Sequence, residues 1–212
     1  MAFAQAPAAP AGGEYPVQLT ITGERQINRL WGIPFIGVFV RMILAIPHFI
    51  VLGIMVIGLY VYFALGWIPI LLMGRQPSIV ARFLTEYLHR AYRIAGYVFF
   101  LLPGGYPPFG VGDPNPVDLK VAWEGRTLSR FWGVLLLGPL VRYVILIPHL
   151  IVLGVLAIVA FISFIVLWIP ILVTGKYPNA FASFYTSFLR YGARIAAYML
   201  LLPVPYPPFS LS

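Results

Sequence analysis

The most informative residues of this chain are arginines that lie in apolar segments. Arg190 and Arg194 lie one helical turn apart in a segment that contains no acidic residue. A guanidinium in or near hydrocarbon costs at least about 2.5–3.5 kcal/mol when it has no partner. We therefore expect a partner outside the segment, and a lipid phosphate, a carboxylate of another subunit or an anionic substrate would each suit arginine. The simpler alternative is that these side chains snorkel to headgroups or bond helix carbonyls.

The earlier copy of this segment carries more charge, and part of that charge is offset locally. Glu86 lies four residues from both Arg82 and Arg90, a spacing that brings side chains together on a helix. The residues that we predict to bind lipid or a partner are Arg41, Arg82, Arg90, Arg93, Arg142, Arg190 and Arg194.

Two histidines also recur at the same place, since His48 and His149 each follow a proline directly. Paired histidines inside a membrane suit axial ligation of a tetrapyrrole or a proton relay. The alternative is a polar ring in the first turn of a helix, where it meets headgroups or water. We favour this alternative because no carboxylate or third ligand lies nearby in the sequence. We therefore expect no metal site and no resident cofactor, and the tetrapyrrole remains the second interpretation.

The sequence contains no recognisable catalytic set. It lacks cysteine, which excludes disulfides, thiolate metal sites and cysteine nucleophiles. It also lacks a glycine-rich phosphate loop, a Ser-His-Asp order and an HExxH pattern. We therefore predict that the protein is not an enzyme.

These residues sit in two copies of one apolar unit. Residues 41–53 recur as residues 142–154, with 8 of 13 positions identical. Both copies continue through Trp-Ile-Pro, Gly-Arg/Lys-x-Pro and Arg-Ile-Ala, and both close on Tyr-Pro-Pro-Phe, a rigid stop for a helix. Such a duplication predicts two quasi-equivalent units. We divide the chain into a disordered Ala/Pro-rich tail (1–15), a first membrane repeat (16–110) and a second membrane repeat (111–212).

The composition indicates an integral membrane protein. Hydrophobic residues make up 61% of the chain, charged residues 9%, and the mean hydropathy is +0.91. Soluble proteins average roughly 25% charged residues. Between Arg41 and Arg75, and between Arg142 and Lys176, 33 consecutive residues contain no Asp, Glu, Lys or Arg, whereas a membrane span needs about 20. We attribute the net charge of +8 to basic residues facing anionic lipid and expect no nucleic-acid partner.

Each unit is expected to contain a strand and a long apolar helix. Apolar residues alternate over 16–21 and 116–121, as in half-buried strands that could pair into a small extramembrane sheet. The long helix should begin near Pro47 and Pro148, end on a glycine cap at positions 74 and 175, and tilt or kink at positions 69 and 170. The expected interface anchors are Trp31, Trp67, Trp132 and Trp168.

A second, amphipathic helix is expected over residues 78–102 and 179–202. It either lies in the headgroup plane or crosses the bilayer with its polar stripe turned inward. We favour crossing, because the stripe is narrow and the helix ends are uncharged. The predicted fold is an all-α membrane protein of two tandem helical-hairpin repeats, with about four membrane helices, two of them amphipathic, and short extramembrane strands.

This fold also predicts a sidedness. If the hairpins are parallel, one side carries a larger basic group and the other side carries the two tight turns. The first group is Arg25, Arg29, Lys120, Arg126 and Arg130, and the second is Arg75 and Lys176. The positive-inside rule then predicts a multi-pass protein of the bacterial inner membrane with both termini in the cytoplasm.

The combined motifs resemble a known family. The pattern is Arg-x4-Ile-Pro-His, then Trp-Ile-Pro-Ile-Leu with Gly-Arg/Lys-x-Pro, then Arg-Ile-Ala-x-Tyr, ending in Tyr-Pro-Pro-Phe. It resembles bacterial integral-membrane proteins catalogued only as a domain of unknown function, in a tandem two-copy form. The resemblance covers nearly the whole chain from about residue 16 and implies a membrane repeat without an activity.

From these features we expect a non-catalytic accessory or structural subunit of a larger membrane complex. It would pack against phospholipids and the helices of other integral membrane subunits. The alternative is a lipid-binding or small-solute transport protein that acts as a homo-oligomer, with its polar stripes lining a shared interior.

Overall fold

The fold consists mainly of helices, with two short strands between them. A computed structural model describes residues 14–21, 26–33, 35–102, 105–110, 117–135 and 137–211. Most of the N-terminal tail that we expected to be disordered lies outside these residues. The first repeat contains β1 (Val17–Ile21), the 3-10 turn η1 (Arg29–Gly32), α1 (Ile36–Leu44), α2 (Ile46–Leu65), α3 (Trp67–Met73) and α4 (Ser78–Val98). The second repeat contains β2 (Val117–Val121), η2 (Arg130–Gly133), α5 (Leu137–Thr174) and α6 (Asn179–Met199).

The long apolar helix begins differently in the two repeats. In the second repeat α5 runs for 38 residues and contains both Pro148 and Pro170. In the first repeat the same length is divided by breaks at Ala45 and Gly66, so Pro47 falls in the first turn of α2. The predicted start is therefore confirmed at Pro47, where α2 begins after the separate helix α1, and wrong at Pro148, which lies inside α5 because the residues before it are already helical.

The predicted ends of the long helices are confirmed. Gly74 and Gly175 both have left-handed backbone angles, with φ of 65° and 67°. Glycine adopts this conformation without steric cost, which is why it closes helices. A tight turn then leads from each long helix into its amphipathic helix.

The two strands pair, as their alternation predicts. β1 and β2 are antiparallel, with Leu19 opposite Leu119 and Val17 opposite Val121. One face of the sheet is buried, and the other presents Gln18, Thr20, Asp118 and Lys120. β1 packs on α6 and β2 packs on α4, so each repeat places its strand on the helix of the other repeat.

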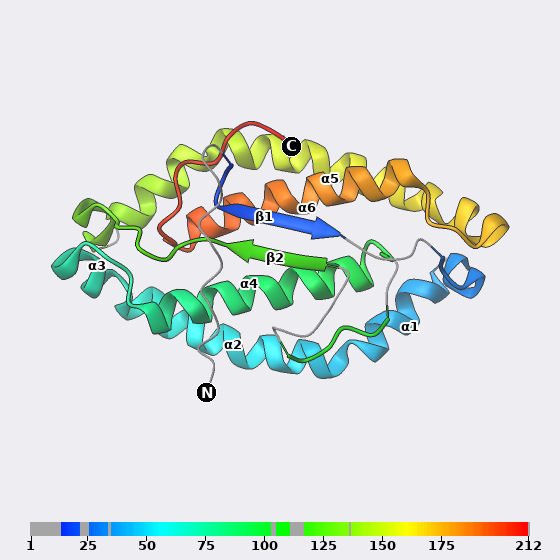
Figure 1. The fold of residues 1–212 in the computed structure, drawn as a ribbon, viewed down its shortest axis with the longest axis horizontal. Coiled ribbons are helices and arrows are strands. Elements are labelled where there is room, and N and C mark those ends of the chain that lie inside the picture. Colours follow the sequence, from blue (N-terminus) through cyan, green and yellow to red (C-terminus); the bar gives the residue numbers. More distant parts are fainter. Residues whose placement is uncertain are drawn as a thin grey trace.

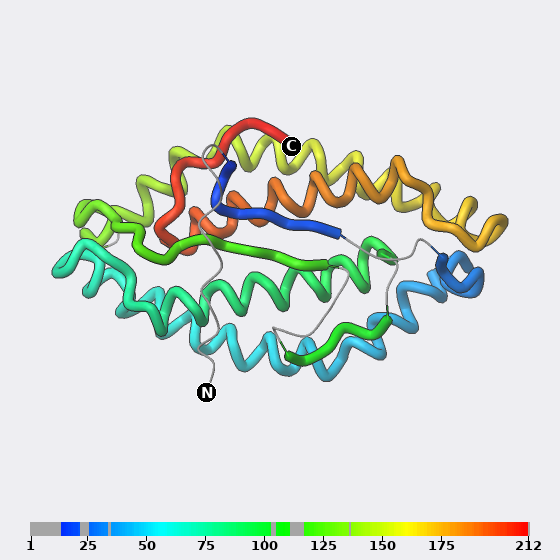
Figure 2. The backbone as a smooth tube through the Cα atoms, viewed as in Figure 1, coloured from blue at the N-terminus to red at the C-terminus, as the bar shows by residue number. Residues whose placement is uncertain are grey.

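The two repeats run in opposite directions (Figures 1 and 2). The backbone N–H of Leu128 donates to the Gly74 carbonyl at 2.9 Å, and the N–H of Ile27 donates to the Gly175 carbonyl at 3.0 Å. The turn that ends each long helix therefore lies beside the start of the other repeat's long helix.

The prediction of two parallel hairpins is wrong for this reason. The Arg29 side chain lies beside Gly175, and the Arg130 side chain lies beside Gly74. At each of these two places, residues that we expected on opposite sides of the membrane lie together. The physical cause is β2, which follows α4 and returns along its length before α5 begins (Figure 1).

The molecule is layered. The sheet contacts α4 and α6, and these two helices contact α2 and α5 on their other side. Among the described residues, α2 and α5 are long and apolar enough to cross a membrane. The amphipathic helices lie between these apolar helices and the sheet.

Candidate functional site

Buried arginines of the amphipathic helices bind the outer edges of the sheet. Arg194 donates through Nε to the Val17 carbonyl at 3.4 Å and through Nη1 to the Ser210 carbonyl at 3.2 Å. Arg93 makes the equivalent bonds to Val117 at 3.3 Å and to Gly110 at 2.9 Å. A two-stranded sheet has two open edges, and each guanidinium supplies donors to carbonyls on one of them.

The remaining arginines of the stripe differ in position. Arg190 is half-buried and donates to the Leu19 carbonyl at 3.0 Å, next to Arg194 on the same strand edge. Arg90 is half-buried, and its Nε has no hydrogen-bond partner among the described residues. Arg82 is exposed on α4, where it lines a shallow groove together with Glu86. Arg190 and Arg194 therefore have partners within the chain, and these are carbonyls of β1 and of the C-terminal segment.

Arg41 and Arg142 occupy aromatic cages inside the protein. Each is 2% exposed. Nη1 of Arg41 donates to the carbonyl of Tyr97, and Nη1 of Arg142 donates to the carbonyl of Tyr198, both at 2.8 Å. These carbonyls end α4 and α6, where a positive charge is favoured by the helix dipole.

Tryptophan and tyrosine rings complete both cages. The Arg41 guanidinium lies 4.8 Å from the Trp31 ring and 4.7 Å from the Tyr97 ring. Arg142 lies 4.7 Å from the Trp132 ring and 4.2 Å from the Tyr198 ring. Cation–π contacts of this kind stabilise a desolvated guanidinium by about 2 kcal/mol.

The histidines lie under the Tyr-Pro-Pro-Phe closures. His48 stacks on Phe109 with ring centroids 4.1 Å apart, and His149 stacks on Phe209 at 3.8 Å. His149 Nδ1 also lies 2.7 Å from the Tyr191 hydroxyl. Each closure therefore covers a histidine as well as ending a helix, a role that the sequence did not reveal. Nε2 of each histidine is buried without a hydrogen-bond partner among the described residues, and the tetrapyrrole interpretation stays untested.

The other two tryptophans differ from the cage pair. Trp67, the first residue of α3, donates from its indole to the carbonyl of Ala64 in α2 at 2.8 Å. Trp168 is half-buried and lines a small apolar crevice of about 70 Å³ beside η1. Their role as interface anchors stays a prediction.

The structure brings together one titratable pair, His89 and Asp118, that we did not predict from the sequence. His89, on the polar stripe of α4, has its Nε2 3.6 Å from Asp118 Oδ1 on the sheet. Burial, with Arg93 and Arg90 nearby, lowers the pKa of His89 to about 4 in spite of the attraction of Asp118. The neutral imidazole is thus the form that the folded protein favours.

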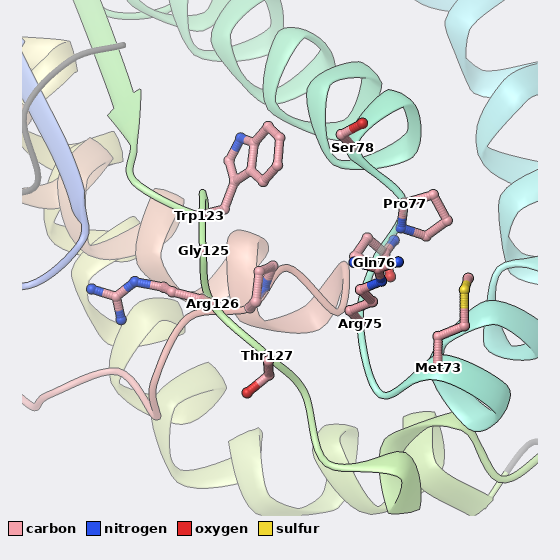
Figure 3. Close-up of a pocket in the computed structure, with 10 residues that line it drawn as sticks. Met73, Arg75, Gln76, Pro77, Ser78, Trp123, Gly125, Arg126 and Thr127 are labelled. Atoms are coloured by element: carbon pink, nitrogen blue, oxygen red, sulfur yellow. The ribbon is translucent and has the colours of Figure 1, made fainter.

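A cavity of about 490 Å³ lies beside the start of α4 (Figure 3). Its wall combines the turn before α4, from Arg75 to Ser78, with the loop between β2 and η2, which contributes Trp123 and Arg126. The charged residues among its described lining are the two arginines. Gln76 is 7% exposed, and neither its Nε2 nor its Oε1 has a hydrogen-bond partner among the described residues.

Two ranges of the chain, residues 36–109 and 138–210, match a family model described as "Domain of unknown function (DUF4389)". The chain belongs to this family. The resemblance inferred from the repeated motifs is confirmed, including the tandem two-copy form. No curated protein and no solved structure matches the chain.

The two matches show what a DUF4389 repeat contains in this chain. Each includes the long apolar helix, the amphipathic helix and the Tyr-Pro-Pro-Phe closure, and therefore also the caged arginine and the covered histidine. β1 and β2 lie outside both matches. The cage tryptophans, Trp31 and Trp132, also lie outside the matches, whereas the arginine, the tyrosine and the histidine of each copy lie inside one.

Proposed function

We propose that this DUF4389 protein is a non-catalytic lipid-binding protein that lies in one leaflet of the bacterial cytoplasmic membrane. The observation that carries the proposal is the layering, with apolar helices on one side of the amphipathic pair and a polar sheet on the other. The apolar helices would enter the acyl chains, and the sheet would face water.

The long helices offer a broad surface to hydrocarbon. On α2, Ile54 and Ile57 are 63% and 64% exposed, and on α5, Ile158 and Phe161 are 62% and 66% exposed. Both helices bury only a narrow seam against their amphipathic neighbours. Apolar patches of this extent on a protein surface mark contacts with membranes or other proteins.

The length of α5 favours lying in a leaflet over crossing. At 1.5 Å per residue its 38 residues extend about 57 Å, whereas the hydrocarbon core is about 30 Å thick. Crossing would require a tilt beyond the usual limit of about 40°.

The strands give a second reason. β1 and β2 run along α4 and α6 (Figure 1), so amphipathic helices that crossed the bilayer would carry the sheet into it. Asp118 and Lys120 on its outer face would then meet hydrocarbon, which is unfavourable. This arrangement favours the headgroup plane for α4 and α6 over the four crossing helices that we expected.

The same layering weakens the transport alternative. The polar stripes of α4 and α6 face the sheet, where Arg93 and Arg194 bond strand carbonyls. A shared aqueous interior would need these stripes open to solvent.

Both ends of the described chain lie with the sheet. Tyr15 donates its hydroxyl hydrogen to the Pro205 carbonyl at 2.8 Å, and Ser210 accepts from Arg194 at 3.2 Å. The net charge of +8 favours the anionic cytoplasmic leaflet. We therefore propose that both termini are cytoplasmic.

An accessory subunit of a larger membrane complex is the second candidate. The exposed apolar faces of α2 and α5 would also fit the helices of another integral membrane protein. The arginines no longer favour this role, because carbonyls of the same chain bind Arg41, Arg142, Arg190 and Arg194.

Single-cysteine labelling tests the proposed orientation, and the absence of native cysteine makes it direct. We would place cysteines at Arg75 and Lys176, which lie at opposite ends of the molecule, at Lys120 on the sheet and at Ile54 on the apolar face. A membrane-impermeant maleimide is then applied to spheroplasts and to inverted vesicles.

A protein in the cytoplasmic leaflet should react at positions 75, 120 and 176 in inverted vesicles only, and position 54 should stay protected. Reaction of positions 75 and 176 from opposite sides would show that the long helices cross, and would overturn the proposal. Co-purification of a stoichiometric membrane complex in mild detergent would favour the accessory subunit.

A further inference from the structure

An apolar crevice of about 70 Å³ lies where the start of the first repeat meets α5 of the second. Trp31 of η1 and Trp168 of α5 both line it, and all of the described residues in its lining are apolar. Ile165, on the same wall as Trp168, is 53% exposed, so the crevice is continuous with the apolar surface of α5. Its chemistry therefore suits a hydrocarbon chain and not a polar ligand.

The walls of the crevice are fixed by contacts elsewhere in the fold. The Trp31 ring also forms part of the cage of the buried Arg41, with 4.8 Å between the guanidinium and the ring centroid. The next residue, Gly32, brings η1 so close to α5 that a Cβ on it would lie 2.5 Å from the backbone nitrogen of Leu172. The crevice is therefore part of the packed structure, and a ligand would find it already formed.

Phe35 stands at the crevice in a strained and exposed conformation. It lines the crevice, its side chain is 89% exposed, and its φ is 62°. A bulky residue adopts this region of backbone space at a cost, and such strain is often found at functional sites. In hydrocarbon the exposed ring would be favourable, so Phe35 would lie beside a lipid chain in the crevice.

Two cations lie together beyond the crevice. The end of α5 lies beside η1 (Figure 1), and Arg29 packs its side chain against Gly175, the residue before Lys176. Both cations are exposed, and neither forms an ion pair with another residue that the structure describes. From Trp168 to Gly175 the helix rises about 10 Å, which is within the roughly 15 Å that one leaflet of hydrocarbon spans.

The other end of the molecule has the same charge but a different apolar wall. Arg130 and Arg75 stand there at the positions that correspond to Arg29 and Lys176. Ala64 stands at the position of Ile165, and α2 ends after the next residue, whereas α5 continues through this region without a break. The two ends thus separate the contribution of charge from the contribution of the crevice.

We propose that the crevice and the two cations beside it bind one anionic phospholipid. An acyl chain fills the crevice between Trp31 and Trp168, and the phosphate lies between the side chains of Arg29 and Lys176. That the ligand is a membrane lipid rests on the proposed function, and the two cations select lipids with a net negative charge.

Thiol labelling inside the crevice tests this site, because the chain has no native cysteine. Val38, half-buried in the lining, is replaced by cysteine, and its reaction with a maleimide is timed in neutral detergent. Dioleoylphosphatidylglycerol should slow the reaction at least about tenfold more than the same amount of dioleoylphosphatidylcholine, since two cations contribute to its binding. Arg29→Gln with Lys176→Gln should abolish this difference. Arg130→Gln with Arg75→Gln should leave it within about twofold.

The controls locate the effect. Ile158→Cys, on the exposed face of α5, should be slowed equally by both lipids. Arg130 packs on Gly74 as Arg29 packs on Gly175, so the two double variants lose matching contacts with their turns and differ in the crevice beside them.

The outcomes separate the site from the membrane function. Equal slowing at position 38 by both lipids, or equal losses in the two double variants, would overturn the site. Slowing by inorganic phosphate as strong as that by phosphatidylglycerol would overturn the lipid as its ligand. Flotation with neutral phosphatidylcholine liposomes reports the proposed function separately, because every variant should float if the apolar helices embed, whatever happens at the crevice.

Discussion

Single arginines join this protein's strands to its helices. A strand edge exposes carbonyls that need donors, and a buried guanidinium needs acceptors, so each group satisfies the other. Arg194 bonds β1 and the C-terminal segment, and Arg93 bonds β2 and the segment after the first closure. Equivalent arginines of the two repeats thus each bond the open edge of one strand.

Replacing Arg194 with methionine should destabilise the fold. The Val17 and Ser210 carbonyls would lose their charged donor, and each such bond contributes about 1.5–3 kcal/mol. We expect Arg194→Met to lower the free energy of unfolding by about 3 kcal/mol, measured by denaturant titration in detergent with circular dichroism. Arg82→Met, on the exposed face of α4, is the control and should change it by less than about 0.5 kcal/mol. Equal effects would contradict the anchoring role.

His89 should make stability depend on pH. Its pKa is about 4 in the folded protein, against about 6.5 in an unfolded chain. Below pH 6.5 the unfolded chain therefore binds more protons, so stability is complete above that pH and falls as the pH approaches 4. Thermal unfolding between pH 4 and 7 should show this loss in wild type and a flatter profile in His89→Gln. A profile that does not change in the variant would rule out His89 as the group responsible.

At the scale of elements, sequence patterns predicted the secondary structure of each segment better than they predicted its contacts. The alternation of Val17, Leu19, Val117 and Leu119 predicted paired strands, and the glycines at 74 and 175 predicted the helix ends. The partners of the arginines were not predictable in the same way, because backbone carbonyls leave no signature in a sequence.

Close packing of the short turns on the long helices should be sensitive to a single methyl group. A Cβ added at Gly133 would meet the backbone of Leu71, with its Cα only 2.7 Å away. At Gly154, within α5, nothing lies within 4 Å of the same atom. We expect Gly133→Ala to lower the free energy of unfolding by about 2 kcal/mol through overpacking. Gly154→Ala should raise it by up to about 1 kcal/mol, since alanine favours helix. Matching losses in both variants would contradict this packing.

At the scale of the whole molecule, the orientation of the two repeats could not be read from the duplication. Parallel and antiparallel repeats bury the same helix faces, so the periodicity of each copy fits both. The strands decide between the parallel and the antiparallel arrangement. Because β1 and β2 pair antiparallel, the two repeats that follow them are related by a rotation that reverses their direction. Each strand then covers the helix of the other repeat, and neither repeat has a complete polar layer alone.

A single repeat expressed alone should therefore associate with a second copy of itself. In the segment 111–212 expressed alone, α6 would lack β1, and Arg194 would lose the Val17 carbonyl. Two copies of β2 paired about Leu119 would place Asp118 of one chain opposite Lys120 of the other, a favourable cross-strand pair. We expect a homodimer in detergent by light scattering, with Asp118→Lys shifting it toward unfolded or aggregated monomer through like charges. A stable, folded monomer of this segment would mean that the repeats fold independently, and that the shared sheet is not what holds them together.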